Sequence, residues 1–267
     1  CALDIIGATF LREVENGEIV YIENNELNSL KPFGEHKPRP CVFEYIYFSR
    51  PDSFLRGKTA YEYRKNLGKE LAREDTVEAD LVVPVPDSGN AAAIGYSHEK
   101  KINFELGLIR NHYVGRTFIE PGQQIRSLGV KLKLNANKSS IEGKSIILVD
   151  DSLVRGTTSH KIVKMLYDAG AKEVHLRIAC PEIKYPDFYG VDMPTKKELL
   201  AANKSVEEIC EYVQAKSLKF LSIKGLYKAL GYQGRNNTTP QLTDHYFTGE
   251  YPIKLVDQLG DSKITQL

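Results

Sequence analysis

Two short runs of consecutive apolar residues, LVVPV at 81–85 and IILV at 146–149, constrain the fold more than any other feature of the chain. Each run is followed by a polar loop that contains glycine, and then by a segment with helical character. Strands that are apolar at every position are typical of parallel sheets that helices cover on both faces. The alternation of such strands with helices therefore predicts an α/β fold, with a central, mostly parallel sheet flanked by helices.

Other segments fit this plan. Apolar residues recur at helical spacing over 59–74 and predict an amphipathic helix. Ser205 and Glu208 occupy the N-cap and N3 positions of a capping box, which predicts a helix directly after Ser205. The further expectations are a strand or hairpin near 17–27, an aromatic-rich buried strand over 42–53, a strand over 172–181, and helices near 195–203 and 222–231.

Composition and charge exclude several classes of protein. The 267 residues carry a formal net charge of +1, which argues against a dedicated binder of nucleic acid or of anionic membranes. No apolar run of about eighteen residues is present, and the first residues lack the basic and apolar regions of a secretory signal. The four cysteines show no C-x-x-C spacing, so we expect reduced thiols in a cytoplasmic protein.

Polar residues, three of them acidic, follow the two apolar runs at the edge of the predicted sheet where α/β proteins bind ligands. Asp87 and Ser88 follow the first run, and Asp150 and Asp151 follow the second. Because successive strand side chains point to opposite faces, we expect the two adjacent carboxylates to diverge. Carboxylates in this position suit the hydroxyl groups of a sugar or the hydration shell of Mg²⁺. The two loops therefore predict one shared site.

The sequence RGTTS at 155–159 predicts phosphate binding. Gly156 allows a tight turn and a close approach of the backbone to a ligand. Thr157, Thr158 and Ser159 offer hydroxyl groups beside the free N–H groups of a helix start, which attracts anions. Acids for a ribose and donors for a phosphate describe a sugar-phosphate site, whereas P-loop and G-x-G-x-x-G motifs are absent. A purely structural reading, with a glycine turn and a threonine cap, explains these residues singly but not their combination.

The segment 110–138 combines many cations with few periodic signals. Its charged residues are six cations and one acid: Arg110, Arg116, Arg126, Lys131, Lys133, Lys138 and Glu120. We interpret it as a flexible loop that closes over a phosphorylated ligand, with a solvated basic loop as the alternative. Nucleic-acid binding is disfavoured because only Tyr113 and Phe118 supply aromatic rings.

Several stretches in one order resemble the amidophosphoribosyltransferase family. ILVDDSLVRGTT, at 147–158, is similar to the signature with which type I phosphoribosyltransferases bind phosphoribosyl pyrophosphate (PRPP). The stretches that narrow the resemblance to this family are YIYFSRPDS, VPDSGNAAAIGY, RNHYVGRTFIEPGQQIR, VKLKLNAN and FYGVDMPTKKELLA. The likeness covers essentially the whole chain and fades after Gly231.

The resemblance implies a type I phosphoribosyltransferase fold and a reaction. Ammonia drawn from glutamine would be transferred to C1 of PRPP, giving 5-phosphoribosylamine and pyrophosphate in the first step of de novo purine biosynthesis. Residues 1–40 would be a small β remnant of an N-terminal-nucleophile glutaminase domain, 41–231 the phosphoribosyltransferase domain, and 232–267 a C-terminal extension. The glutaminase domain and further copies of the chain, in a homo-oligomer, are the implied protein partners; none is expected among nucleic acids or membranes.

The resemblance also assigns roles to residues. Asp150 and Asp151 would contact the ribose hydroxyls and, with Ser88, hold Mg²⁺. Residues 155–159 would bind the 5′-phosphate, and Arg116 would act in catalysis with the two acids. The residues expected to contact PRPP are Asp87, Ser88, Arg110, Arg116, Asp150, Asp151, Ser152, Arg155, Gly156, Thr157, Thr158 and Ser159.

Two expectations concern cysteine. CALDIIGA resembles an internal strand of the glutaminase domain, so Cys1 is not expected to be its nucleophile. Some family members hold an iron–sulfur cluster with four cysteines. Here Cys41 matches the first, Asp187 stands at the second, and the last two are replaced within TTPQLTDHYFTG. One thiolate cannot hold a cluster, so none is expected.

Two alternatives share the PRPP site: a salvage or orotate phosphoribosyltransferase, and a PRPP-binding regulator without catalysis. The first leaves YIYFSRPDS and RNHYVGRTF unexplained. The second would be expected to carry a nucleic-acid-binding module, and no helix-turn-helix or basic patch precedes the predicted sheet.

Overall fold

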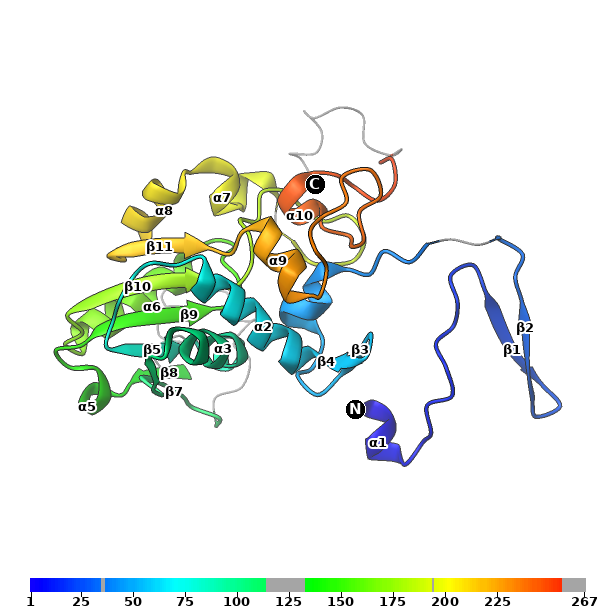
Figure 1. The fold of residues 1–267 in the computed structure, drawn as a ribbon, viewed down its shortest axis with the longest axis horizontal. Coiled ribbons are helices and arrows are strands. Elements are labelled where there is room, and N and C mark those ends of the chain that lie inside the picture. Colours follow the sequence, from blue (N-terminus) through cyan, green and yellow to red (C-terminus); the bar gives the residue numbers. More distant parts are fainter. Residues whose placement is uncertain (35–36, 114–132, 194, 256–267) are drawn as a thin grey trace.

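A five-stranded parallel sheet forms the centre of the protein (Figure 1). The structure is a computed structural model, and it describes residues 1–34, 37–113, 133–193 and 195–255. In spatial order its strands are β11 (Ser217–Phe220), β10 (Glu173–Ile178), β9 (Ser145–Asp150), β5 (Leu81–Pro84) and β6 (Asn103–Phe104). All neighbouring pairs run parallel. The two apolar runs of the sequence form β5 and β9, at the middle of the buried core. The predicted α/β fold is confirmed.

Helices follow or precede the strands as the sequence predicted. α3 (Asn90–Lys100) follows β5 and packs against β5 and β9, while α6 (Thr157–Asp168) follows β9 and packs against β10. α2 (Ala60–Arg73) packs against α3 and against α9 (Ile223–Ala229). α8 (Val206–Val213) begins with the predicted capping box of Ser205 and Glu208.

The chain also forms shorter elements, among them a helix within CALDIIGA, where the resemblance implied a strand. They are α1 (Ala2–Ile6), η1 (Glu44–Phe48), β3 (Phe54–Leu55), β4 (Lys58–Thr59), β7 (Leu108–Arg110), β8 (Leu134–Ala136), α5 (Lys138–Ile141), η2 (Lys196–Glu198), α7 (Leu200–Asn203) and α10 (His245–Thr248). The helix expected near 195–203 is thus divided into a 3-10 turn and a four-residue helix.

The aromatic run after Val42 forms a π-helical turn, η1, where the sequence predicted a buried strand. Tyr45 packs edge-to-face on Tyr63 of α2, and Arg64 donates hydrogen bonds to the carbonyl oxygens of Tyr45 and Ser49 at 3.2 and 2.6 Å. The prediction was wrong because aromatic and β-branched composition favours strands only where a sheet is available to pack on. Here α2 supplies the packing surface and the hydrogen-bond donor instead.

Residues 1–34 extend away from the sheet in Figure 1. β1 (Ile19–Glu23) and β2 (Glu26–Leu30) form the expected hairpin, and its turn residues Asn24 and Asn25 both have positive φ, as a two-residue hairpin turn requires. The domain boundaries near 40 and 231 stay predictions. Within the described ranges, no helix is long and apolar enough to cross a membrane.

Two glycines allow α2 and α3 to approach closely. A Cβ atom on Gly68 would lie 1.8 Å from the carbonyl oxygen of Ala92, and one on Gly95 would lie 1.9 Å from that of Lys65. Both contacts are with backbone, so neither can be relieved by moving a side chain. The helix pair therefore depends on the absence of these methyl groups.

We expect Gly68→Ala to lower the free energy of unfolding by about 1–3 kcal/mol, because the helices must separate to admit the methyl group. This loss should appear although alanine favours a helix interior by about 1 kcal/mol over glycine. Gly234→Ala is the matched control, since a Cβ there meets no atom within 4 Å. Urea unfolding of both variants measures the difference; equal stability of the two would contradict the packing argument.

Candidate active site

The loops that follow β5 and β9 leave the sheet side by side. Pro84 lies opposite Val149 in the parallel pairing, and the Val85 N–H donates to the Val149 carbonyl oxygen at 2.8 Å. A Cβ atom on Gly89 would lie 2.4 Å from that same carbonyl oxygen, so glycine permits this close approach. The hydroxyl of Ser88 lies 3.4 Å from Oδ1 of Asp150. The structure thus brings together the two loops that the sequence predicted to share a site.

Asp150 and Asp151 form a crowded acid pair at the end of β9. Both side chains are buried, and Oδ1 of Asp150 accepts the Asp151 N–H at 2.9 Å. Burial raises the pKa of Asp150 well above its ordinary value, and the neighbouring Asp151 carboxylate raises it further. The prediction that the carboxylates diverge was wrong: β9 ends at Asp150, so the alternation of strand side chains does not extend to Asp151. Oδ2 of Asp151 accepts the hydroxyl of Ser152 at 2.6 Å.

The predicted phosphate-binding residues surround the start of α6. Gly156 precedes the helix with φ of 71°, a left-handed conformation that glycine adopts without strain. Thr157 and Thr158 are exposed in the first turn, whereas Ser159 is buried. A Cβ atom on Gly156 would lie 2.5 Å from Leu200 and 3.1 Å from the Tyr212 ring. The helix start therefore offers free N–H groups and two accessible hydroxyl groups to an anion.

Two predicted cationic residues lie at the site in ion pairs. Arg110 pairs with Asp87, which brings together two of the predicted PRPP residues. Nε of Arg155 lies 3.2 Å from Oε1 of Glu198, in the 3-10 turn η2. Both pairs are partly exposed, so they hold the guanidinium groups near the site without removing them from water. Arg116 and most of the predicted closing loop lie outside the described residues.

Comparison with known proteins gives this geometry a context. The chain is 57% identical to the amidophosphoribosyltransferase of Rhizobium etli over 98% of its own length and 54% of that protein. It is 50% identical to that of Bacillus subtilis, over 96% of the chain and 53% of that protein. The chain is an amidophosphoribosyltransferase homologue. It spans about half the length of the curated relatives it matches.

A solved structure of this family supports the assignment. It is the glutamine PRPP amidotransferase from B. subtilis complexed with ADP and GMP. The match covers 96% of this chain and 56% of the solved chain, with a TM-score of 0.87 and 49% sequence identity. No family model matches the chain. The predicted resemblance to the amidophosphoribosyltransferase family is confirmed.

Three residues near the site were not singled out from the sequence. Arg64 is buried under η1, and burial lowers its pKa while the carboxylate of Asp151 opposes that change. The sequence could have indicated Arg64, because it lies four residues after the apolar Ala60 in the predicted helix and so on the same, core-facing side. Glu198 and Tyr212 come from segments more than forty residues after Asp150, and their positions follow from the fold alone.

The oxygen donors of the acid pair fit a magnesium ion. Among the described residues, no group of three histidine, cysteine or acidic side chains is arranged to hold a metal. Mg²⁺ is commonly bound through one or two carboxylates, with water and substrate oxygens as its other ligands. Asp150, Asp151 and the hydroxyl of Ser88 supply donors of this kind. A cation would favour the charged form of Asp150, whose pKa is raised by burial and then by the Asp151 carboxylate.

Cys41, Asp187 and the segment within which the last two cluster cysteines are replaced lie together, but their side chains do not fit an iron–sulfur cluster. Sγ of Cys41 lies 3.3 Å from the Tyr246 hydroxyl, and Nε2 of His245 lies 2.8 Å from Oδ1 of Asp187. Of these four side chains only Cys41 offers a thiolate, whereas a cluster needs four such ligands. These four side chains instead join the segments around 41, 187 and 245 by packing and polar contacts.

Proposed function

We propose that this chain catalyses the transfer of ammonia to C1 of PRPP, giving 5-phosphoribosylamine and pyrophosphate, with glutamine as the ammonia source of the whole protein. The observation that supports it most is the acid pair Asp150–Asp151 beside Ser88 and an exposed Thr157–Thr158 helix start, in a chain 57% identical to a named amidophosphoribosyltransferase. The proposal includes the predicted place in purine biosynthesis, a cytoplasmic homo-oligomer and the division at residues 40 and 231.

The proposed substrate contacts follow the chemistry of each group. The N–H groups and hydroxyls at the start of α6, Thr157 to Ser159, would hold the 5′-phosphate, and Arg155 would turn from Glu198 to the same phosphate. Asp150 and Asp151 would accept hydrogen bonds from the ribose hydroxyls. Asp87, Ser88 and Arg110 would lie along the pyrophosphate, with Arg116 completing its charge neutralisation.

In the proposed reaction, the nitrogen lone pair of ammonia forms a bond to C1 as the bond from C1 to the pyrophosphate oxygen breaks. The bonding electron pair leaves with pyrophosphate, and the new ammonium group loses a proton to water. When bound, Mg²⁺ would neutralise the departing pyrophosphate. A neutral amine needs no strong base, so the residues contribute mainly by holding PRPP in position and by stabilising developing charge.

The decisive assay measures pyrophosphate release from PRPP with ammonia supplied directly at high pH. We expect turnover that requires Mg²⁺ and none when adenine, guanine or orotate replaces ammonia. Turnover with one of those bases would support the salvage or orotate alternative. PRPP binding without turnover for any acceptor would support the regulator.

Gly156→Ala is expected to raise KM for PRPP roughly tenfold, because a methyl group at φ of 71° is strained and would push the loop from Leu200 and Tyr212. The change in kcat should be smaller, since the acid pair is not altered. Gly143→Ala is a matched control: its φ is 72°, and a Cβ there meets nothing within 4 Å. Initial rates over a range of PRPP concentrations give KM and kcat for both variants. An equal rise of KM in Gly156→Ala and Gly143→Ala would assign that rise to backbone strain alone.

A further inference from the structure

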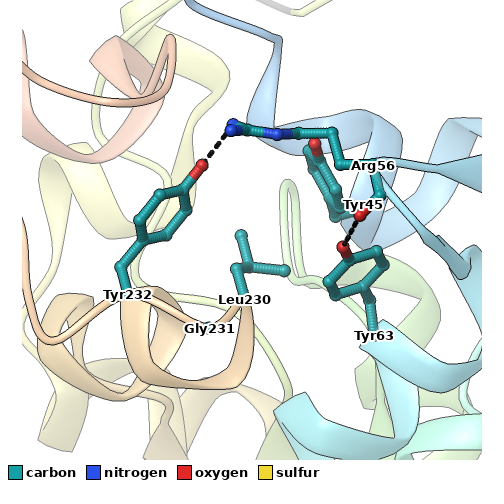
Figure 2. A pocket seen from close by; sticks show the side chains of 6 residues that line it. All are labelled: Tyr45, Arg56, Tyr63, Leu230, Gly231 and Tyr232. Atoms are coloured by element: carbon teal, nitrogen blue, oxygen red, sulfur yellow. Dashed lines mark hydrogen bonds between the residues drawn. The ribbon is translucent and has the colours of Figure 1, made fainter.

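A pocket of about 200 Å³ opens between η1, the β3–β4 turn and the end of α9 (Figure 2). Six residues line it: Tyr45, Arg56, Tyr63, Leu230, Gly231 and Tyr232. None of them belongs to the loops at 86–89 or 150–159, so the pocket is separate from the candidate active site. The proposed function gives it no role.

The charge in this pocket is that of a single cation. Arg56 donates a hydrogen bond to the Tyr232 hydroxyl, and its guanidinium lies 5.7 Å from the centre of the Tyr232 ring. None of the described lining residues is an acid. A guanidinium beside a pocket whose walls carry no carboxylate favours an anionic ligand.

Three of the six lining residues are tyrosines. The buried rings of Tyr45 and Tyr63 meet edge-to-face, with centres 5.0 Å apart, and Figure 2 shows Leu230 between this pair and Tyr232. The Tyr63 hydroxyl donates to the Arg56 carbonyl oxygen at 3.3 Å, which fixes the turn that carries the guanidinium. Burial raises the pKa of Tyr45 to about 12, so its phenol is neutral at physiological pH. The described lining residues therefore carry tyrosine hydroxyl groups and no negative charge.

Size and shape narrow the class of ligand. The volume is below the roughly 300–1,000 Å³ of sites for drug-sized molecules, so the ligand is small. A planar carboxylate matches the planar fork of a guanidinium, and an aromatic ring packs well against tyrosine and leucine. We propose that this pocket binds a small aromatic monocarboxylate, about the size of benzoate, with its carboxylate on Arg56 and its ring against Leu230 and the tyrosines.

Benzoate titrated into the full chain, followed by NMR, tests this site. We expect saturable binding, intermolecular NOEs from the ring protons to the Leu230 methyl groups, and affinity at least roughly tenfold weaker in Arg56→Gln. Lys58→Gln is the control, because Lys58 lies in the same hairpin but does not line the pocket. Thermal melting confirms that both variants are folded.

Three outcomes would overturn the proposal. They are the lack of saturable benzoate binding, equal loss of binding in Lys58→Gln, and inorganic phosphate that competes as well as benzoate does. The last would show an anion site without selectivity for an aromatic ring. Because the assay needs neither PRPP nor ammonia, its result is independent of the proposed transferase activity.

Discussion

Asp150→Asn is expected to lower ammonia-dependent pyrophosphate release by a factor on the order of 100 or more, while the melting temperature stays unchanged or rises. The loss of rate follows because the amide cannot supply the charged oxygen proposed to bind the ribose hydroxyls and Mg²⁺. The gain in stability follows from burial and from Asp151, which raise the pKa of Asp150 and so make its charged form unfavourable in the folded protein. An acid with a merely structural role would show the reverse, a stability loss with normal kinetics.

The expected stability gain of Asp150→Asn can be checked by measuring unfolding at several pH values. A carboxyl whose pKa is raised on folding contributes stability below its unfolded pKa, and that stability is lost as the pH rises toward the folded pKa. Asp150→Asn removes this loss, so its stability relative to wild type should increase between about pH 4 and neutral pH. Asp80→Asn is the matched control, because Asp80 binds the Ser145 N–H at the opposite end of β9. Near-normal turnover of Asp150→Asn would contradict the proposed site.

The sequence predicted those parts of the structure that depend on local pattern. Strands β5, β9 and β10 and helices α2, α6 and α8 follow from apolar runs, helical spacing and a capping box. The meeting of the loops after β5 and β9 followed from a general property of α/β sheets, that loops at the carboxyl ends of neighbouring strands lie together. The comparisons confirmed the resemblance that the local motifs had predicted.

Features that depend on contacts between distant segments could not be predicted in this way. The run after Val42 has strand composition, but Arg64 and Tyr63 hold it as a π-helical turn. The pairing of Arg155 with Glu198 joins residues 43 positions apart. Arg177 is a buried case of the same kind, because an arginine within an apolar strand gives no sign of its partner 102 residues earlier.

Arg177→Met is expected to lower the free energy of unfolding by about 3–5 kcal/mol, because it leaves the buried carboxylate of Asp75 without its counter-charge. Arg177 is 1% exposed and Asp75 6%, and two nitrogens of the guanidinium bind the two carboxylate oxygens. Arg73 of α2 supplies the control: its side chain is half exposed while it pairs with Glu70 and Glu99, so Arg73→Gln should cost about 1 kcal/mol or less. Denaturant unfolding at neutral pH measures both variants.

A double variant and a pH series separate lost charge compensation from lost packing. Burial alone would raise the pKa of Asp75, but hydrogen bonds from Arg177 and Tyr96 outweigh it and hold the pKa below its ordinary value. In wild type this contributes stability above about pH 4 that is lost as the pH falls. In Arg177→Met the hydrogen bonds from Arg177 are gone, so burial raises the pKa of Asp75 and its carboxylate takes up a proton at a higher pH than in wild type. The stability difference between the variant and wild type should therefore shrink from pH 8 to pH 5. Adding Asp75→Asn to Arg177→Met should recover much of the deficit at neutral pH, since no charge then remains buried. A deficit that neither acidification nor the second substitution reduces would instead assign the effect to a packing defect.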